Sequence, residues 1–207
     1  MLASSFVILA DGCFPTHSLP LRCLQTAQKI VCCDGAAVKL EAYGYQPDYI
    51  VGDLDSLPES LKEKYAGRLY PSPDQETNDL TKAVLFCKQQ GAEEIVILGA
   101  TGLREDHTLG NISLLSDYAE MIPKVEMMTD FGTFTVVRKS TVLPSYKGQQ
   151  ISIFALDSNA RLTVGNLKYP IINGPLASWW QGTLNEALGN TFSMTFTTGR
   201  WIVFRCY

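Results

Sequence analysis

The sequence predicts an α/β protein in two parts: a largely parallel α/β sheet domain over residues 1–130, then a small antiparallel β-sandwich domain over residues 131–207. In the first part, short apolar runs alternate with helical patterns, which is typical of βαβ units and a parallel sheet. Beyond residue 130 the helical patterns stop and β-rich runs follow each other. A chain of 207 residues is long enough for two such domains.

The first part contains apolar runs with the length of strands and helical patterns between them. The expected strands are 6–10, 30–33, 49–51, 68–70, 95–98 and 125–128, and the expected helices are 21–28, 37–43, 59–65, 79–90 and 108–121. Asn78 and Thr77 are both suitable N-caps for the fourth of these helices, and Gly91 ends it.

The second part is predicted to be a small β-sheet structure with strands at 133–137, 151–154, 162–164, 192–197 and 201–205. Thr198-Gly199 predicts a hairpin turn between the last two strands. Alternation in the last strand places Trp201, Val203 and Arg205 on one face. Because a domain of this size has little core of its own, we expect it to pack on the first domain or on a second subunit.

Composition excludes several classes of partner. The net charge of −4 argues against a nucleic-acid backbone, which usually requires a basic patch. No apolar run approaches the length of a membrane span, and the first ten residues lack the basic start of a signal peptide. The six cysteines form no CxxC pair, so we expect all of them to be buried free thiols in a reducing cytosol. With only two histidines, a metal would meet mainly oxygen ligands, which suits magnesium.

Polar clusters follow the expected strands at 30–33, 49–51, 68–70 and 95–98. Ligands of open α/β sheets bind at the carboxyl ends of the strands, so four segments are predicted to converge on one site. Asp53 and Asp55 follow the third strand two residues apart. In an extended segment both side chains point the same way and can face one Mg²⁺ ion, although Asp55 or Ser56 could instead cap the next helix.

The segment 74–79 brings acids to the start of a helix, where they commonly complement the helix dipole. In a functional interpretation Asp79 is a third metal ligand and Gln75 is a positioning group. Residues 99–107 form a glycine-containing loop that leads into a helix, a place where backbone N–H groups bind phosphate. Arg104 could bind phosphate oxygens there, or the loop could be a plain turn with Asp106 as N-cap. His107 could line the site or simply pack. Neither GxGxxG nor a P-loop occurs.

Taken together and in order, these motifs resemble those of the thiamine pyrophosphokinase family. They are Asp34-Gly35-Ala36, Gly52-Asp53-Leu54-Asp55-Ser56, Asp74-Gln75 with Thr77-Asn78-Asp79, Arg104-Glu105-Asp106-His107 with Asn111, and Gly165-Asn166-Leu167-Lys168-Tyr169-Pro170 in the second part. Two positions depart from the family pattern: Asn78 stands where a threonine is common, and Leu184 stands where a serine often precedes Asn185-Glu186.

The resemblance implies a homodimer whose subunits have an ATP-binding catalytic domain and a β-sandwich that binds thiamine and dimerises. It implies transfer of diphosphate from ATP to the thiamine hydroxyl, with AMP as the leaving group, in the cytoplasm. The residues it implies are Asp53, Asp55 and Asp79 for Mg²⁺; Asp34, Gly35, Gln75, Thr101, Arg104 and Asp106 for ATP; Arg104 with the three metal acids for catalysis; and Gln75, Thr183 and Asn185 for thiamine. Trp179 and Trp180 precede this last segment and are candidates for the thiamine site as well, because an indole face can hold the cationic thiazolium.

Other interpretations remain open at this point. Each tryptophan could serve core or interface packing instead of binding the cationic thiazolium. A DxD motif also holds the metal of nucleotide-sugar transferases, although such an enzyme does not account for the Arg104 loop or the acidic segment 74–79. A non-catalytic nucleotide sensor with the same fold would bind the same ligands without turnover.

Overall fold

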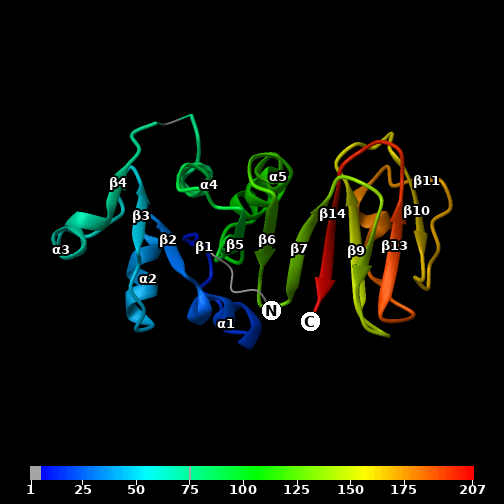
Figure 1. Ribbon diagram of the computed structural model, residues 1–207, viewed down its shortest axis with the longest axis horizontal. Helices are drawn as coiled ribbons and strands as arrows, with labels where there is room; N and C mark the ends of the chain where they lie inside the picture. Colours follow the sequence, from blue (N-terminus) through cyan, green and yellow to red (C-terminus); the bar gives the residue numbers. More distant parts are fainter. Residues whose placement is uncertain (1–5, 75) are drawn as a thin grey trace. The chain divides into compact units, whose positions relative to one another are not determined.

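The computed structural model describes residues 6–74 and 76–207, which form two compact units (Figure 1). The first unit ends at Asp130, and the second comprises Phe131–Tyr207. Gln75 lies outside the described residues. No helix in the described ranges is both long and apolar enough to cross a bilayer.

The strands of the first unit form a parallel sheet in the order β6-β5-β1-β2-β3-β4. They are β1 Phe6–Leu9, β2 Lys29–Cys33, β3 Tyr49–Gly52, β4 Leu69–Pro71, β5 Glu94–Leu98 and β6 Lys124–Met128. The helices are α1 Ser18–Thr26, α2 Ala36–Ala42, α3 Glu59–Lys64, the short 3₁₀ helix η1 Ala66–Arg68, α4 Asp79–Gln89 and α5 Glu105–Met121. The predicted parallel α/β sheet is therefore confirmed.

Helices cover both faces of this sheet. Val7 and Leu9 of β1 belong to a buried cluster that also contains Leu24 of α1 and Leu40 of α2. Because side chains alternate along a strand, Ile8, which is fully buried but absent from that cluster, points to the other face. Helix α4 contacts β1, β2 and β3, and it packs against α5, as Figure 1 also shows. Burial on both faces explains the uninterrupted apolar runs of the strands.

Helix α1 begins three residues earlier than predicted, at Ser18. The imidazole Nδ1 of His17 accepts a hydrogen bond from the backbone N–H of Leu19 at 3.3 Å and caps the helix. Pro20 lies in the first helical turn, where its missing N–H costs nothing, so it belongs to the helix and does not precede it. The helix before Pro123 also starts earlier than expected, at Glu105.

The second unit is built from antiparallel strands in two sheets. One has the order β12-β9-β14-β7 and the other β11-β10-β13-β8. The strands are β7 Gly132–Val137, β8 Thr141–Pro144, β9 Gln150–Ala155, β10 Arg161–Gly165, β11 Gly174–Pro175, β12 Asn185–Glu186, β13 Thr191–Thr195 and β14 Trp201–Cys206, with the 3₁₀ helix η2 at Trp179–Gly182. Residues from both sheets share a buried core, as expected for a sandwich.

The hairpin predicted at Thr198-Gly199 is wrong. Strand β13 pairs with β8 and β10, whereas β14 pairs with β7 and β9, so the turn carries the chain from one sheet to the other. Phe192 and Trp201 are both buried in the shared core and reach it from opposite sheets. Pairing β13 with β14 in one sheet would leave nothing to cover that face, and core burial therefore overrides the local turn signal.

The cysteine prediction is only half right. All six thiols are free, but burial is limited to Cys32, Cys33 and Cys87. Cys13 is exposed in the loop after β1, where its Sγ donates to the carbonyl oxygen of Gly102 at 3.0 Å. Cys23 in α1 and Cys206 in β14 are only partly buried.

Candidate active site

A cavity of about 400 Å³ opens within the first unit beside the carboxyl ends of its strands. Five segments line it: those after β1, β2 and β3, the start of α4, and the loop after β5 with the first turns of α5. The predicted convergence of strand ends is thus present in the fold. The lining residues are Ala10, Asp11, Gly12, Cys33, Asp34, Gly35, Ser56, Asn78, Asp79, Leu80, Ala100, Thr101, Leu103, Arg104, His107, Thr108 and Asn111.

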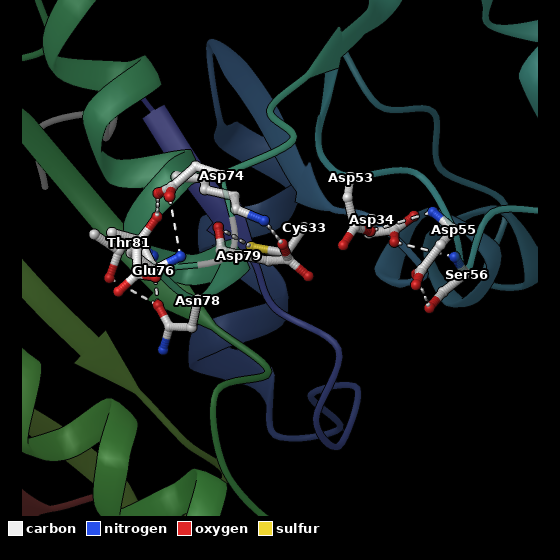
Figure 2. Close-up of polar contacts among 12 residues, drawn as sticks. Cys33, Asp34, Asp53, Asp55, Ser56, Asp74, Glu76, Asn78, Asp79 and Thr81 are labelled. Atoms are coloured by element: carbon white, nitrogen blue, oxygen red, sulfur yellow. Dashed lines mark hydrogen bonds and ion pairs between the residues drawn. The ribbon is translucent and has the colours of Figure 1, made fainter.

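Three carboxylates come together next to this cavity, and of the three only Asp34 is among the residues that line it. Asp34, Asp53 and Asp55 each offer an oxygen that lies within 4.8 Å of the others (Figure 2). The backbone between Asp53 and Asp55 is not extended, because Leu54 has a left-handed φ of 67° and its side chain is buried. This turn, and not the alternation of an extended segment, brings the two acids to the same side. The capping alternative fails, since Pro58 occupies the N-cap position of α3.

Asp34 is the buried member of this carboxylate group. Burial raises the pKa of its side chain to about 6, and the charges of Asp79, Asp53 and Asp55 add to that effect. Only the N–H of Ser56, 3.1 Å from Oδ2, acts in the opposite direction. The Oδ1 atom is buried without a hydrogen-bond partner. A buried carboxylate oxygen with no donor, beside two further carboxylates, fits a hard divalent cation.

Asp79, the third predicted metal ligand, stands apart from that group but lines the same cavity. Its Oδ1 accepts from the Lys82 Nζ at 3.0 Å. Gly52 makes the approach of these acids possible, since a Cβ there would lie 2.9 Å from the Asp34 Cβ and 3.5 Å from the Asp79 Oδ1. The structure therefore groups Asp34 with Asp53 and Asp55, whereas Asp79 is not a member of that group.

Asn78, one of the two departures from the family pattern, caps α4. Its Oδ1 accepts from the backbone N–H of Thr81 at 2.9 Å, which confirms it as N-cap. Its Nδ2 lies 3.4 Å from Oδ1 of Asn111, and the amide of Asn111 donates to the carbonyl of Ala100 at 2.8 Å. The side chain therefore links the starts of α4 and α5 with the loop after β5.

Arg104 and Asp106 form a two-bond ion pair on the rim of the cavity. The Arg104 Nε and Nη2 atoms lie 3.0 and 2.6 Å from the two carboxylate oxygens of Asp106. These bonds hold the pKa of Asp106 at about 2, well below the usual range. Arg104 itself is the N-cap residue of α5, so Asp106 lies in the first turn and is not the cap. His107 lines the cavity, whereas Asp106 is absent from its lining.

Two residues of the site escaped the sequence analysis. Asp11 lies two residues after the end of β1 and lines the cavity, and Lys39 fixes it by an ion pair at 2.8 Å and by a bond to the backbone carbonyl of Gly12 at 2.9 Å. The signal was available, because Leu9 pairs with Cys32 and Asp11 therefore lies beside Asp34 at the ends of the two strands. The other missed residue is Lys82, whose place in α4 looked like an ordinary helix position.

The predicted thiamine-binding residues all lie in the second unit, except Gln75. Trp179 packs on Phe154 and donates its indole N–H to the carbonyl of Ala155 at 3.0 Å, whereas Trp180 is 74% exposed. Thr183 donates to the carbonyl of Trp180 at 2.7 Å. Buried Asn185 accepts from the N–H of Tyr169 at 3.0 Å and donates to its carbonyl at 2.7 Å, so it holds the 165–170 segment in place.

Carboxylates and glycine loops gathered at the strand ends of a parallel sheet are typical of α/β proteins that bind phosphorylated ligands. The family model for the catalytic domain of thiamin pyrophosphokinase matches residues 21–127, just over half of the chain. The model for the substrate-binding domain of thiamin pyrophosphokinase matches residues 132–204. The chain belongs to the thiamin pyrophosphokinase family.

Curated relatives are similar in sequence to this chain over shorter segments. Thiamine pyrophosphokinase 1 of Oryza sativa subsp. japonica is 38% identical over 96 residues, which are 42% of this chain and 36% of the rice protein. Thiamin pyrophosphokinase 1 of Caenorhabditis elegans is 33% identical over 99 residues, 44% of this chain and 40% of the nematode protein. The matched regions thus span well under half of these relatives.

Solved structures match nearly end to end. A thiamin pyrophosphokinase family protein from Enterococcus faecalis has a TM-score of 0.84 with 21% identity and covers 99% of both chains. Thiamine pyrophosphokinase from Bacillus subtilis has a TM-score of 0.82 with 23% identity, covering 97% of this chain and 98% of that one. At these identities the likeness concerns the fold.

Proposed function

We propose that this chain is a thiamine diphosphokinase, which transfers the β,γ-diphosphate of ATP to the hydroxyl of thiamine and releases AMP. The observation that carries the proposal is the match of two consecutive family models, catalytic and substrate-binding, to a chain whose first unit has acids and glycine loops around one cavity. The alternatives are weaker, because a nucleotide-sugar transferase has no use for the Arg104 loop.

We propose that Asp53, Asp55 and Asp34 hold Mg²⁺ together with Asp79 on the cavity wall. The support is the grouping of the first three within 4.8 Å and the buried, partnerless Oδ1 of Asp34. Bound magnesium would screen the phosphate oxygens while charge redistributes in the transition state. In the absence of the ion the four acids repel one another, so the site binds its anionic substrate weakly until the cation is present.

The remaining cavity residues are suited to bind and orient the triphosphate. Thr101 and Gly35 line the cavity beside the N-termini of α5 and α2, where backbone N–H groups are available. Arg104 offers its guanidinium from the rim. Asp106 engages Nε and Nη2 and thereby sets the orientation of the guanidinium, while further N–H groups remain for phosphate oxygens.

The reaction we propose is a direct displacement. The thiamine oxygen forms a bond to the β-phosphorus, the bond between that phosphorus and the α,β-bridging oxygen breaks, and AMP leaves with the bridging oxygen. A carboxylate of the cavity accepts the hydroxyl proton. Arg104 stabilises the charge that develops on the phosphate oxygens.

Thiamine binding is assigned to the second unit in this proposal. Trp180 is the better candidate for binding the thiazolium, because its ring is largely exposed. Trp179 instead donates its indole N–H to the backbone carbonyl of Ala155. Thr183 and Leu184 follow directly and Asn185 fixes the neighbouring segment. Gln75 keeps its proposed roles toward ATP and thiamine on sequence grounds alone.

We also infer a homodimer in the cytoplasm. Several large apolar side chains of the second unit are exposed, including Phe131 and Ile172, both 80% exposed, which favours burial against a second copy. The six free thiols favour a reducing compartment. Sedimentation equilibrium should give twice the chain mass of 22.9 kDa, and a mass of one chain would contradict the dimer.

The proposed activity is tested by supplying ATP, Mg²⁺ and thiamine and separating the products. We expect AMP and thiamine diphosphate in equal amounts. ADP would indicate an ordinary kinase, and ligand-dependent thermal stabilisation without any turnover would indicate a nucleotide sensor.

A further inference from the structure

Helix α4 contains a buried lysine that none of the motifs described above includes. The side chain of Lys82 is only 4% exposed, and its Nζ lies 3.0 Å from Oδ1 of Asp79. Lysines are rarely buried this deeply unless they are paired. Lys82 is absent from the residues that line the cavity, and its described ion pair is with Asp79, which does line it.

Lys82 forms an ion pair with Asp79, with 3.0 Å between Nζ and Oδ1, beside the group of Asp34, Asp53 and Asp55. The lysine therefore presents a fixed positive charge to the acidic side of the cavity. A buried cation of this kind needs an anion at hydrogen-bond distance, and Asp79 provides it.

The pair also restricts Asp79. Lys82 engages Oδ1 of the carboxylate at 3.0 Å. The backbone carbonyl of Asp79 lies 3.6 Å from the Cys33 Sγ. Because Lys82 occupies Oδ1 of Asp79, Oδ2 is the carboxylate oxygen that remains for contacts in the cavity.

We propose that Lys82 is a positioning residue, which holds the Asp79 carboxylate in the orientation needed for cation and diphosphate binding. This inference rests on the proposed function, in which Asp79 lies on the wall of the magnesium site. Lys82 acts through Asp79 and has no independent contact with the substrate.

A rival role for Lys82 is simple charge neutralisation, and the two roles predict opposite effects on metal binding. If Lys82 only offsets negative charge, its removal makes the site more negative and tightens Mg²⁺ binding. If it positions Asp79, its removal frees that carboxylate to rotate and weakens Mg²⁺ binding. The sign of the change decides between them.

The test is a double-mutant cycle of Lys82→Met, Asp79→Asn and their combination. Methionine keeps the length of the side chain and removes the charge. Lys88→Met is the matched control, an exposed lysine in the last turn of the same helix. One readout is the Mg²⁺ concentration that half-saturates thermal stabilisation without nucleotide, and the other is kcat for AMP release.

We expect Lys82→Met to raise the half-saturating Mg²⁺ concentration and to lower kcat, each at least ten-fold, with Lys88→Met close to wild type. The combined variant should match Asp79→Asn alone within about two-fold, because Lys82 acts only through that carboxylate. Tighter Mg²⁺ binding in Lys82→Met, wild-type behaviour, or effects that multiply in the combined variant would each overturn the proposal.

Two further outcomes keep the test decisive. If Lys82→Met does not fold, Lys82→Arg replaces it in the cycle, with loss of Mg²⁺ affinity expected because the larger guanidinium shifts the carboxylate. If the wild type makes no AMP at all, the proposed function fails, while the magnesium readout still tests whether Lys82 and Asp79 act together.

Discussion

The two units of this chain differ in where they place their polar side chains. In the first unit, strands buried on both faces leave polar groups only at their ends, and the parallel arrangement brings those ends to one cavity. In the second unit, antiparallel strands alternate buried and exposed residues along their length, and the polar groups spread over the surface. The parallel sheet therefore places polar side chains together at one edge, where they can form a catalytic site. The sandwich instead presents a surface that can bind a substrate or another protein.

This difference makes the two units respond differently to substitution. Changes at the cavity of the first unit should affect turnover and metal binding. Changes at η2 of the second unit should affect thiamine affinity or stability. The following predictions test that division.

Asp53→Asn and Asp55→Asn should have the largest effect. Each removes a carboxylate from the group that holds the cation, so AMP release should fall at least about 100-fold. Both residues lie on a loop, and the midpoint of thermal unfolding in metal-free buffer should fall little. Glu63→Gln, an exposed acid in α3, is the matched control. Near-normal turnover with Mg²⁺ in either variant would show that the substituted carboxylate is not needed to bind the ion.

Arg104→Ala should lower kcat by about 100-fold, the usual loss when a charged donor to the transition state is removed. The KM for ATP should change much less, because Mg²⁺ and the backbone N–H groups still bind the phosphates. Steady-state kinetics on this variant and on Arg22→Ala, an exposed arginine of α1, measure the difference. A rise in KM with unchanged kcat would limit Arg104 to ground-state binding.

Trp180→Ala and Trp179→Ala should separate recognition from packing. Loss of the exposed Trp180 ring should raise the KM for thiamine about 2- to 30-fold, as expected for a cation over an indole face. Loss of Trp179, which packs on Phe154, should instead lower the free energy of unfolding by about 1–3 kcal/mol. Steady-state kinetics and urea unfolding on both variants measure the two effects. A higher KM for thiamine in Trp179→Ala, with lower stability in Trp180→Ala, would show that Trp179 binds thiamine and Trp180 packs.

The smallest expected effect is on the stability of the metal-free protein, which Asp34→Asn should raise by about 1–2 kcal/mol at pH 7. The variant removes a charge that three acids repel, and its amide can donate to those acids. Because the folded pKa is about 6 and the unperturbed value is 3.8, wild-type Asp34 loses stability as the pH rises through that window. Denaturant unfolding in EDTA should therefore give nearly equal free energies of unfolding for wild type and variant at pH 4, and a higher value for the variant at pH 7. A difference that stays the same between pH 4 and pH 7 would show that the ionisation of Asp34 is not its cause.

The sequence predicted the sheet, the convergence of strand ends and most residues of the cavity, because hydrophobic periodicity and strand-end polarity are local signals. It predicted that Asp53 and Asp55 come together, but it did not predict that Asp34 joins them or that Asp79 stands apart from the three. The grouping of Asp34 with Asp53 and Asp55 depends on the left-handed turn at Leu54, and the engagement of Asp79 depends on Lys82, whose burial is a property of packing. The hairpin error has the same cause, since the partners of β13 and β14 are decided by the core that both sheets share.

The central claim is that this cavity directs attack on the β-phosphorus of ATP, and ATP labelled at one phosphate at a time tests it most directly. With Mg²⁺ and thiamine present, label from the β- and γ-positions should appear in thiamine diphosphate, and label from the α-position should remain in AMP. Transfer of the γ-label alone, with ADP as the other product, would contradict the account.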